Sequence, residues 1–323
     1  MQGIKILKNP KLRNPLLIVA WPGMGEVAFK AAMYLVNKLR AEEFASMPAE
    51  EFFYFTASTI EGGILKLPEP PSNKFYYWKN KGGNNDLIIF ISDSQPDLSR
   101  VDLYCKRIIS LAKSFKVKMI IGMAAMPQPI DHTQESRVWF SATSKEINEE
   151  LKKYSPNLLS DGQISGMNGL FLGMAKREGL SGFCLLGEIP LYAIQIENPK
   201  ASHAVLEALS RALNIRIEFA DIIEQTHIIE GEINKLLDYL KLGPQGLGPI
   251  GEEEIERIKK SLSQLTKLPV SVKKKIESLF EQAGYDIAKA GELKAELDKW
   301  NAYKEYEDRF LDLFKKSKDK GNN

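Results

Sequence analysis

The sequence predicts an α/β fold, in which a mostly parallel sheet is covered by helices on both faces and is followed by a C-terminal helical extension. Two observations support this prediction. Up to about Leu242, continuous apolar runs alternate with segments of helical periodicity. Such runs are typical of strands buried on both faces, and strands that alternate with helices indicate a parallel sheet. Beyond residue 251 the chain is rich in charge and lacks strand patterns.

The expected elements follow in order along the first part of the chain. Buried strands are expected where the apolar runs occur, at 16–21, 86–93, 117–123 and 183–187. Helices are expected at 27–39, 98–115 and 199–213. Ser99 is the expected cap of the second helix. Pro199 begins the third, and proline is tolerated at the first position of a helix.

An antiparallel insertion is expected between Glu43 and Lys79. The aromatic runs 52–55 and 75–78 have high β propensity, and no helical pattern separates them. They predict antiparallel strands or a hairpin. A further strand is expected at 138–143.

A domain boundary is expected at 243–251, which holds four glycines and two prolines in nine residues. Such a stretch is not expected to continue a helix. The predicted organisation is therefore an α/β core at 1–242, a linker at 243–251, a helical extension at 252–316 and a disordered tail at 317–323. Within the extension, helices are expected at 252–265, 270–282 and 286–314.

An aromatic stripe recurs every three or four residues near the C-terminus. It comprises Trp300, Tyr303, Tyr306, Phe310 and Phe314. A stripe at this spacing lies on one face of a helix and needs a surface to cover it. Two interpretations stay open, packing against the α/β body and contact with another chain.

Composition excludes several classes of protein. Lys and Arg total 44 against 42 Asp and Glu, a net charge of +2, whereas nucleic-acid binders usually have a clearer basic excess. No stretch approaches the roughly 20 apolar residues of a membrane span. Cys105 and Cys184 lie far apart among apolar residues, a pattern typical of reduced, buried thiols. We therefore expect a cytoplasmic protein that binds neither nucleic acid nor membrane.

Catalytic and metal-binding patterns are absent from the sequence. His132, His203 and His227 are scattered, and none has the spacing of a metal ligand pair. No nucleophile motif of the G-x-S-x-G type occurs. The expectation is therefore a protein with no catalytic residues, no metal and no cofactor.

Two glycine-rich turns are candidates for ligand binding. Gly23 and Gly25 lie in a turn between an expected strand and an expected helix, and Gly166, Asn168 and Gly169 lie at the entry to another helix. Backbone amides at such turns can hold a phosphate or carboxylate. The alternative is that the glycines serve tight turns and close helix packing.

Two carboxylates are further candidates. Glu61 is followed by Gly62 and Gly63, a pair that would form a turn presenting the carboxylate, or merely a hairpin corner. Glu188 follows an apolar run, where it would lie at the carboxyl end of a strand. Open α/β sheets bind ligands at that edge. The alternatives for Glu188 are a solvent-exposed loop carboxylate and an ion pair.

The order of these motifs resembles the proteasome assembly chaperone family, in its archaeal and bacterial branch. The resemblance rests on three segments in the family's order and spacing. They are 20–28, 165–170 leading into 173–179, and 186–190 running on to 199–201. Together they span roughly residues 15–215.

The resemblance implies an α/β fold close to that of nucleoside phosphorylases, no established catalytic activity, and self-association into rings or cages. Some archaeal members engage proteasome subunits through a C-terminal ending of a hydrophobic residue, a tyrosine and any residue. Residues 318–323 of this sequence lack that pattern. The resemblance therefore does not imply docking to proteasome subunits by that route.

Two functions are therefore weighed. The first is a non-enzymatic homo-oligomeric scaffold or assembly chaperone whose clients include proteasome subunits. The second is a protein that binds or transforms a small molecule such as a nucleoside or carboxylate, with the glycine turns as an anion site and Glu61 or Glu188 orienting the ligand. Likeness of fold alone does not decide between them.

Overall fold

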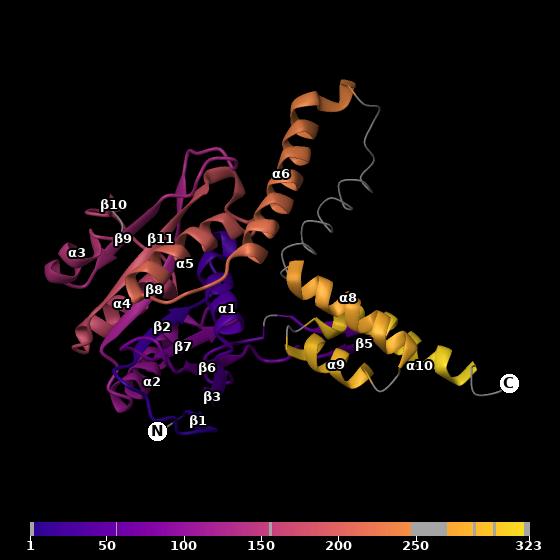
Figure 1. Cartoon of the computed structure of the whole chain (residues 1–323), viewed down its shortest axis with the longest axis horizontal. Helices are drawn as coiled ribbons and strands as arrows, with labels where there is room; N and C mark the ends of the chain where they lie inside the picture. The colour runs from indigo at the N-terminus through magenta and orange to yellow at the C-terminus, as the bar shows by residue number, and fades with distance from the viewer. Residues whose placement is uncertain are drawn as a thin grey trace. The chain divides into compact units, whose positions relative to one another are not determined.

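The computed structural model describes residues 3–55, 57–154, 157–246, 270–286, 289–299 and 302–319. The chain divides into two units, Met1–Phe219 and Ala220–Asn323. The first unit contains all the strands of the described residues and the second is helical (Figure 1). None of the described helices is long and apolar enough to cross a membrane.

Nine strands of the described residues form one mixed sheet in the order β1-β3-β6-β7-β2-β8-β11-β9-β10. Their bounds are Lys5–Ile6 (β1), Leu16–Ala20 (β2), Glu42–Ser46 (β3), Asn73–Trp78 (β6), Leu87–Ser92 (β7), Met119–Gln128 (β8), Val138–Ala142 (β9), Asn157–Leu158 (β10) and Gly182–Pro190 (β11). The remaining strands, Thr59–Glu61 (β4) and Ile64–Lys66 (β5), form a separate hairpin.

The four central strands, β7, β2, β8 and β11, pair in parallel. On one side of them β6, β3 and β1 pair antiparallel. Strand β6 and most of β3 lie within 43–79, the range in which an antiparallel insertion was predicted. On the other side β9 runs antiparallel to β11, and β10 runs parallel to β9. The predicted α/β class, with its parallel centre, is therefore confirmed.

Helices cover both faces of the sheet, as predicted. The helices of this unit are Val27–Leu39 (α1), Val101–Ser114 (α2), Lys145–Leu151 (α3), Met167–Arg177 (α4) and Pro199–Leu213 (α5). Two glycines, one in β8 and one in β11, show which helix packs on each face of the sheet. A Cβ on Gly122 would lie 3.0 Å from atoms of α4, whereas a Cβ on Gly187 would lie 2.8 Å from the carbonyl oxygen of Ala201 in α5. Close approach of the helices therefore requires glycine in both strands.

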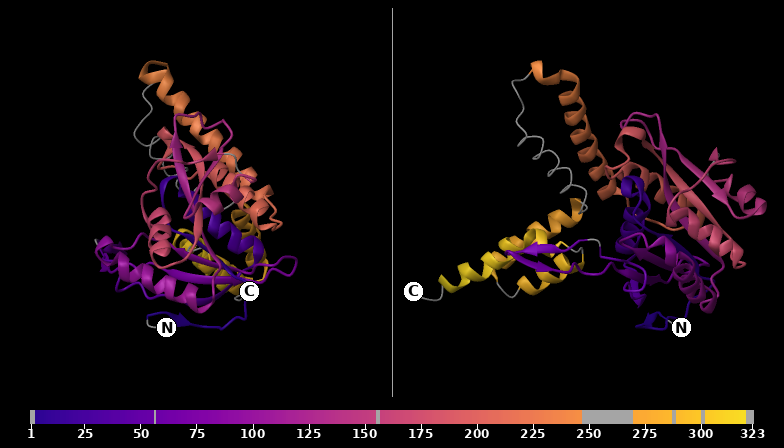
Figure 2. Two further views of the ribbon diagram at one scale, coloured as in Figure 1. Left: turned by 90° about the vertical axis from the view of Figure 1, so that its left-hand side faces the viewer. Right: turned by 180° about the vertical axis from the view of Figure 1, so that it is seen from behind.

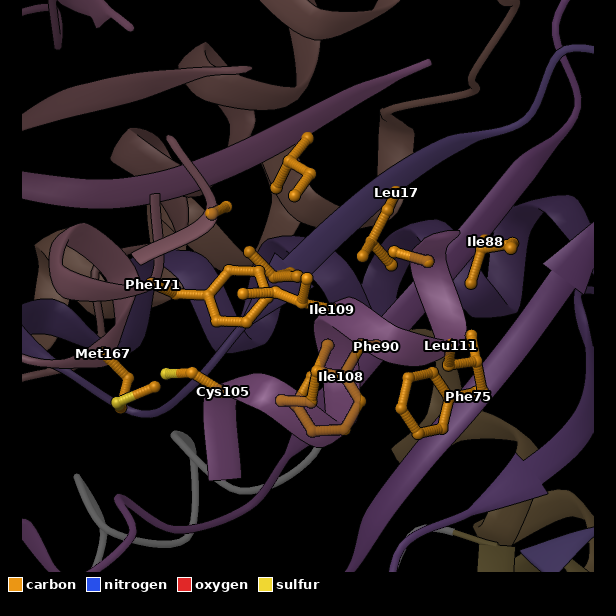
Figure 3. Packing of buried hydrophobic residues seen from close by; sticks show 14 of the residues in the cluster. Leu17, Phe75, Ile88, Phe90, Cys105, Ile108, Ile109, Leu111, Met167 and Phe171 are labelled. Atoms are coloured by element: carbon orange, nitrogen blue, oxygen red, sulfur yellow. The ribbon is translucent and has the colours of Figure 1, made fainter. Parts of the chain in front are cut away.

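The main core lies between the sheet and the helices α2 and α4 (Figure 3). Alternate residues of the buried strands, such as Leu17 and Val19 of β2, point into it. Aromatic rings fill its centre. Trp21 lies 5.4 Å from Phe90 and 5.5 Å from Phe171, measured between ring centroids.

Some predicted elements differ from those observed. The aromatic run 52–55 is a turn and irregular chain in its described residues, because Phe52 is buried edge-on against Tyr104. The antiparallel partner of β6 is β3 instead. The side chain that caps the helix after β7 is Asp97, which accepts a hydrogen bond from the amide of Ser99 at 2.7 Å, so the predicted cap Ser99 is wrong.

The second unit contains the helices Ala220–Gly246 (α6), Val270–Tyr285 (α8), Ala290–Lys299 (α9) and Tyr303–Asp319 (α10). Helix α6 continues through Gly243 and Pro244 into the stretch predicted as a linker. The single helix predicted at 286–314 is wrong, because the chain forms α9 and α10 there. Helix α10 extends into the segment for which disorder was expected, and the helix predicted at 252–265 lies outside the described residues.

Helices α8, α9 and α10 share a small core of their own. Ile276, Phe280, Leu293, Leu297 and Phe310 are buried in it. Of the aromatic stripe, Phe310 belongs to this core, Tyr306 stacks on Phe280, and Phe314 stays 42% exposed. Trp300 lies outside the described residues. The stripe's contact with another chain stays a prediction.

Candidate functional site

The two predicted glycine turns meet at the carboxyl end of β2. Asn168, in the first turn of α4, makes two hydrogen bonds with the main chain of Trp21. Its Oδ1 accepts from the Trp21 amide at 3.0 Å, and its Nδ2 donates to the Trp21 carbonyl at 2.9 Å. Gln95 joins the same turns, since its Nε2 donates to the Pro22 carbonyl and its Oε1 accepts from the Met167 amide.

The backbone of these turns requires glycine at two positions. Gly25 and Gly166 have φ angles of 61° and 72°, in the region that residues with a Cβ rarely adopt. A Cβ on Gly25 would also lie within 3.4 Å of Ile189 and Asn198. The glycine pattern singled out in the sequence therefore serves tight turns that bring β2, α4 and α5 together.

Several amides of these turns donate hydrogen bonds within the protein. The Gly25 amide donates to the Ile194 carbonyl at 2.8 Å, and the Gly169 amide donates to the Gly166 carbonyl at 3.2 Å. The amides of Trp21 and Met167 are engaged by Asn168 and Gln95, as described above. A bound oxyanion would have to displace these contacts, so the geometry gives no support to an anion site built on these four amides.

Glu26, the next residue, has a left-handed backbone with φ 52° at the start of α1. Burial raises the pKa of its carboxyl group, and the charge of Lys30 acts in the opposite direction. Lys30 itself forms an ion pair with Glu197 at 2.9 Å, and the side chain of Glu197 is 3% exposed. This side of the turn is therefore a half-buried ionic cluster.

Glu188 lies within β11 and is buried. Its Oε1 accepts from Trp139 Nε1 at 2.7 Å, and its Oε2 accepts from Arg137 Nε at 3.0 Å. Both partners come from the loop and strand of β9, so the carboxylate ties β9 to β11 as an ion pair, one of the alternatives raised by the sequence.

Glu61, Gly62 and Gly63 are not brought together with the other predicted residues. They form the tip of the β4–β5 hairpin, where both glycines have positive φ, as a tight two-residue hairpin turn requires. The carboxylate of Glu61 pairs with Lys66 at 2.9 Å across the hairpin.

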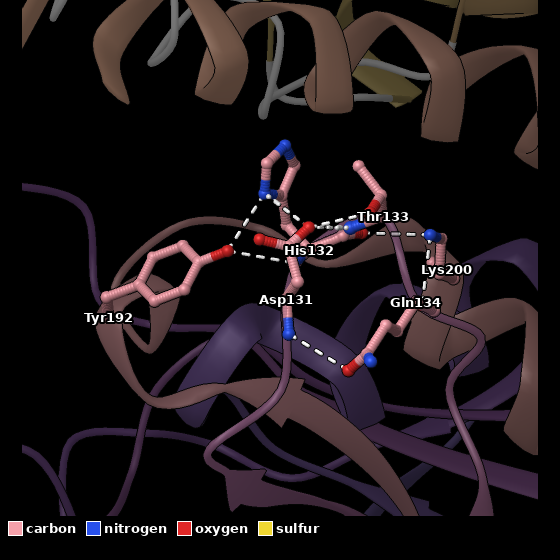
Figure 4. Close-up of polar contacts among 6 residues, drawn as sticks. All are labelled: Asp131, His132, Thr133, Gln134, Tyr192 and Lys200. Carbon is pink, nitrogen blue, oxygen red and sulfur yellow. Dashed lines mark hydrogen bonds and ion pairs between the residues drawn. The ribbon is translucent and has the colours of Figure 1, made fainter. Parts of the chain in front are cut away.

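A polar cluster that sequence reasoning missed lies in the loop after β8 (Figure 4). His132 Nδ1 and the His132 amide both lie 2.8 Å from the hydroxyl of Tyr192, and Asp131 accepts from Thr133. Lys200 of α5 donates to the His132 carbonyl at 2.9 Å. Partial burial raises the pKa of Tyr192. No sequence signal joins these residues, because the contacts bridge 60 and 68 positions.

A cleft of about 500 Å³ lies beside the entry to α4. Its lining residues are uncharged, and comprise Ser141, Leu159, Ser160, Gly162, Gln163, Ile164, Ser165, Gly166, Gly169, Leu170 and Gly173. Of the predicted ligand residues, Gly166 and Gly169 line it.

The described residues contain no group of His, Cys, Asp or Glu able to hold a metal ion. Both thiols are buried, and burial raises the pKa of Cys105 and of Cys184 to about 12. Because the thiolate is the reactive form, neither thiol is activated for nucleophilic chemistry.

A known protein family and several known proteins are similar to this chain. The model of the PAC2 family matches residues 17–237, which include the glycine turns, Glu188 and the cleft. The chain belongs to the PAC2 family. A curated relative, the uncharacterized protein MJ1210 of Methanocaldococcus jannaschii, is 28% identical over 235 residues, which cover 72% of this chain and 86% of the relative.

Two solved structures are similar to this PAC2 protein in both fold and amino-acid sequence. Pyrococcus furiosus PbaB, an archaeal proteasome activator, is 28% identical with a TM-score of 0.61, over 72% of this chain and 97% of PbaB. Pyrococcus furiosus PbaA, an archaeal homolog of proteasome-assembly chaperone, is 26% identical with a TM-score of 0.55, over 72% of this chain and 96% of PbaA. The family predicted from the three sequence segments is therefore confirmed.

Proposed function

We propose that this chain is a non-enzymatic, homo-oligomeric, assembly-chaperone-like protein of the cytoplasm whose partners are proteasome subunits. The observation that supports this most directly is its membership of the PAC2 family together with its likeness to PbaB and PbaA over nearly their whole length. Those two proteins are described as a proteasome activator and as a homolog of a proteasome-assembly chaperone.

The chemistry of the candidate site supports a scaffold role. Glu188 is held by Arg137 and Trp139, and Glu61 is paired with Lys66. The carboxamide of Asn168 forms hydrogen bonds with the main chain of Trp21. The groups offered by the sequence for orienting a small molecule are thus engaged in holding loops and strands together.

The surface supports binding of proteins. Several large apolar side chains of the first unit are exposed, among them Tyr54, Phe55, Leu98, Leu191 and those of the β4–β5 hairpin. Exposed apolar side chains that gather in patches mark sites of protein interaction. A chaperone needs such surfaces both for its own assembly and for its clients.

The test combines native mass spectrometry with reconstitution. The full chain is purified gently, its mass is measured, and it is then incubated with proteasome α- and β-subunits of the source organism. We expect a discrete oligomer without a small-molecule adduct, a complex with at least one of the subunits, and faster assembly or higher peptidase activity of the proteasome.

The control replaces this chain with an unrelated α/β protein of similar size. A monomer that carries a stoichiometric small molecule and binds no proteasome subunit would overturn the proposal and favour the ligand-binding alternative. The mass of the adduct would then identify the ligand class.

A further inference from the structure

Positive charge is concentrated at one edge of the sheet. The central strands run side by side in the same direction (Figures 1 and 2), so the segments that lead into β2, β7, β8 and β11 meet at one edge. Strand β3 is antiparallel to β6, which is antiparallel to β7, so β3 begins at the same edge. These five segments are 7–15, 40–41, 79–86, 115–118 and 178–181. We name them the basic edge.

The basic edge holds eight basic residues and two acidic ones. The basic residues, all of them exposed, are Lys8, Lys11, Arg13, Arg40, Lys79, Lys81, Lys116 and Lys118. Neither acidic residue is available to neutralise them. Asp86 is buried and accepts hydrogen bonds from the amides of Arg13 and Asn80, and Glu178 forms an ion pair with Lys113 of α2 at 3.1 Å.

The opposite edge of the sheet has the reverse balance. The segments that follow the same four central strands are 21–26, 93–100, 129–137 and 191–198. Their acidic residues are Glu26, Asp93, Asp97, Asp131, Glu135 and Glu197, and their basic residues are Arg100 and Arg137. The net charge of the whole chain is only +2. The chain therefore separates its charges between the two edges.

Helix dipoles do not explain the whole of the basic edge. Basic residues are favoured where helices end, and Arg40 and Lys116 do follow the last turns of α1 and α2. Lys11, Lys79 and Lys81, however, lie in segments that connect one strand to the next. Their charge has no helix end to stabilise.

Hydrogen bonds fix the backbone of the basic edge. The Lys118 amide donates to the Pro15 carbonyl at 2.9 Å, and the Asp86 amide donates to the Arg13 carbonyl at 3.0 Å. The Arg13 guanidinium donates to the Asn80 carbonyl at 3.0 Å. Three segments from distant parts of the chain are thus joined, and a surface that is already ordered loses little entropy when it binds.

The charges of the basic edge reinforce one another and remain available. Strands β7, β2 and β8 are neighbours, spaced about 4.8 Å apart. This spacing is shorter than the screening length of about 8 Å at physiological ionic strength. The ammonium groups of Lys11, Lys81, Lys116 and Lys118 form no hydrogen bond or ion pair with any residue that the structure describes. The positive potential is therefore directed outward.

We propose that the basic edge binds an acidic surface segment of a partner protein. The inference rests on the proposed function and names the surface that meets the partner. Complementary charge steers the encounter of two proteins and selects against partners of the wrong charge. A rigid row of unpaired ammonium groups meets both needs, and carboxylates are the protein groups that complement it.

Nucleic acid is the competing polyanion, and the basic edge lacks the features that favour it. Surfaces that bind single strands combine basic residues with aromatic rings on which the bases stack. Phe115 is the one aromatic residue of the five segments, and its ring packs edge-on against Phe44 at 5.3 Å. Nucleic-acid-binding domains also have a clear basic excess over the whole domain. An acidic protein segment is therefore the better match.

The experiment measures the binding of a fluorescent polyglutamate peptide to the full chain by anisotropy, with a polyglutamine peptide of equal length as the reference. We expect the chain to bind polyglutamate alone, and more weakly as salt is added. Lys81→Glu/Lys118→Glu should lower the affinity by about tenfold. Arg100→Glu/Lys153→Glu is the matched control, because it changes the net charge equally at exposed residues outside the basic edge.

Two results with the peptide would overturn the proposal. One is an absence of polyglutamate binding by the wild type. The other is an equal loss of affinity in the control, which would assign binding to the overall charge. Thermal denaturation verifies that each variant is folded, and Lys81→Gln/Lys118→Gln, which removes the charges without reversing them, replaces the reversed variant if that one does not fold.

A second arm uses proteasome α- and β-subunits and separates this inference from the proposed function. We expect Lys81→Glu/Lys118→Glu to weaken the complex and the control to preserve it. Complexes of equal affinity from all three chains would overturn the inference and leave the proposed function standing. A wild type that binds polyglutamate but neither subunit would overturn the proposed function instead.

The remaining arms test other occupants of the basic edge. Duplex DNA that binds more tightly than polyglutamate would assign the surface to nucleic acid and overturn the proposal. A smaller mass of Lys81→Glu/Lys118→Glu in light scattering would assign it to a second copy, with the same consequence. Glutamate-to-glutamine changes at 252–254, which lie outside the described residues, test the chain's own acidic run. Tighter polyglutamate binding by that variant would show that the run covers the basic edge and would overturn the proposal.

Discussion

The carboxamide of Asn168 makes both of its hydrogen bonds to the main chain of a single residue, Trp21, across 147 positions of the chain. Trp21 is fully buried and Asn168 is nearly so. The pair holds the turn after β2 against the first turn of α4, where no neighbouring strand is available to satisfy those backbone groups. Asn168 therefore joins the two glycine turns from the buried side, and Gln95 joins them by its bonds to Pro22 and Met167.

Replacing Asn168 tests that relationship. Asn168→Ala leaves the buried amide and carbonyl of Trp21 without partners, and each such group costs about 1–3 kcal/mol. We expect the free energy of unfolding to fall by about 3 kcal/mol, measured by urea denaturation followed through tryptophan fluorescence. Gln95→Ala is the comparison, because Gln95 bridges the same turns by an exposed bond to the Pro22 carbonyl and a part-buried bond from the Met167 amide, so its loss should be smaller. Equal losses from the two variants would contradict this account.

Much of the sheet was predictable because burial on both faces leaves an unbroken apolar run. Strands β2 and β7 and helices α1 and α5 follow the expected ranges closely. The run 52–55 was wrongly predicted as a strand because its residues have high intrinsic β propensity. Its observed conformation depends on a tertiary contact, the burial of Phe52 against Tyr104. Helices α9 and α10 were joined in the prediction because the aromatic spacing continues across the break between them.

The residues of the candidate site could be predicted from the sequence, but the contacts between them could not. The glycines of the turns stand out in the sequence, and two of them do have positive φ. That Asn168 would bind Trp21, or that Lys200 would bind the carbonyl of His132, depends on how distant elements pack. Local pattern carries no information on such contacts.

Glu26 gives a second prediction, because its left-handed backbone is unfavourable for a residue with a Cβ. Glu26→Gly relieves that strain and also removes a half-buried carboxyl group whose pKa is raised by burial. We expect the free energy of unfolding to rise by about 1 kcal/mol. Glu26→Gln is the control, since it removes the charge and keeps the strain. The expectation fails if the glutamine variant is as stable as the glycine variant.

Gly187 gives a third prediction, through the close approach of α5 to β11. A Cβ there would lie 2.8 Å from the carbonyl oxygen of Ala201, so Gly187→Ala forces the helix away from the sheet. We expect a loss of about 2 kcal/mol in the free energy of unfolding. Gly231→Ala in α6, where no atom lies within 4 Å of the Cβ position, is the control and should stabilise by about 0.5–1 kcal/mol. Thermal denaturation of both variants measures the contrast.

His203 gives a prediction of pH dependence. Burial lowers its pKa, while the charges of Glu207 and Glu135 act in the opposite direction. Its ring packs edge-on against Phe219 at 4.8 Å. Because the unfolded chain binds a proton more readily than the folded one, this group favours the folded state above its unfolded pKa of about 6.5. That contribution is lost as the pH falls from there through the lower folded pKa.

His203→Gln removes this titration. We expect the melting temperature of the wild type to fall more than that of the variant between about pH 7 and pH 5, because protonation of the wild-type ring then opposes folding. The difference is small, since the side chain is only partly buried and solvent screens its charge. Above about pH 7 the two melting curves should change in parallel. A wild type that gains stability relative to the variant on acidification would reverse the sign and refute the assignment.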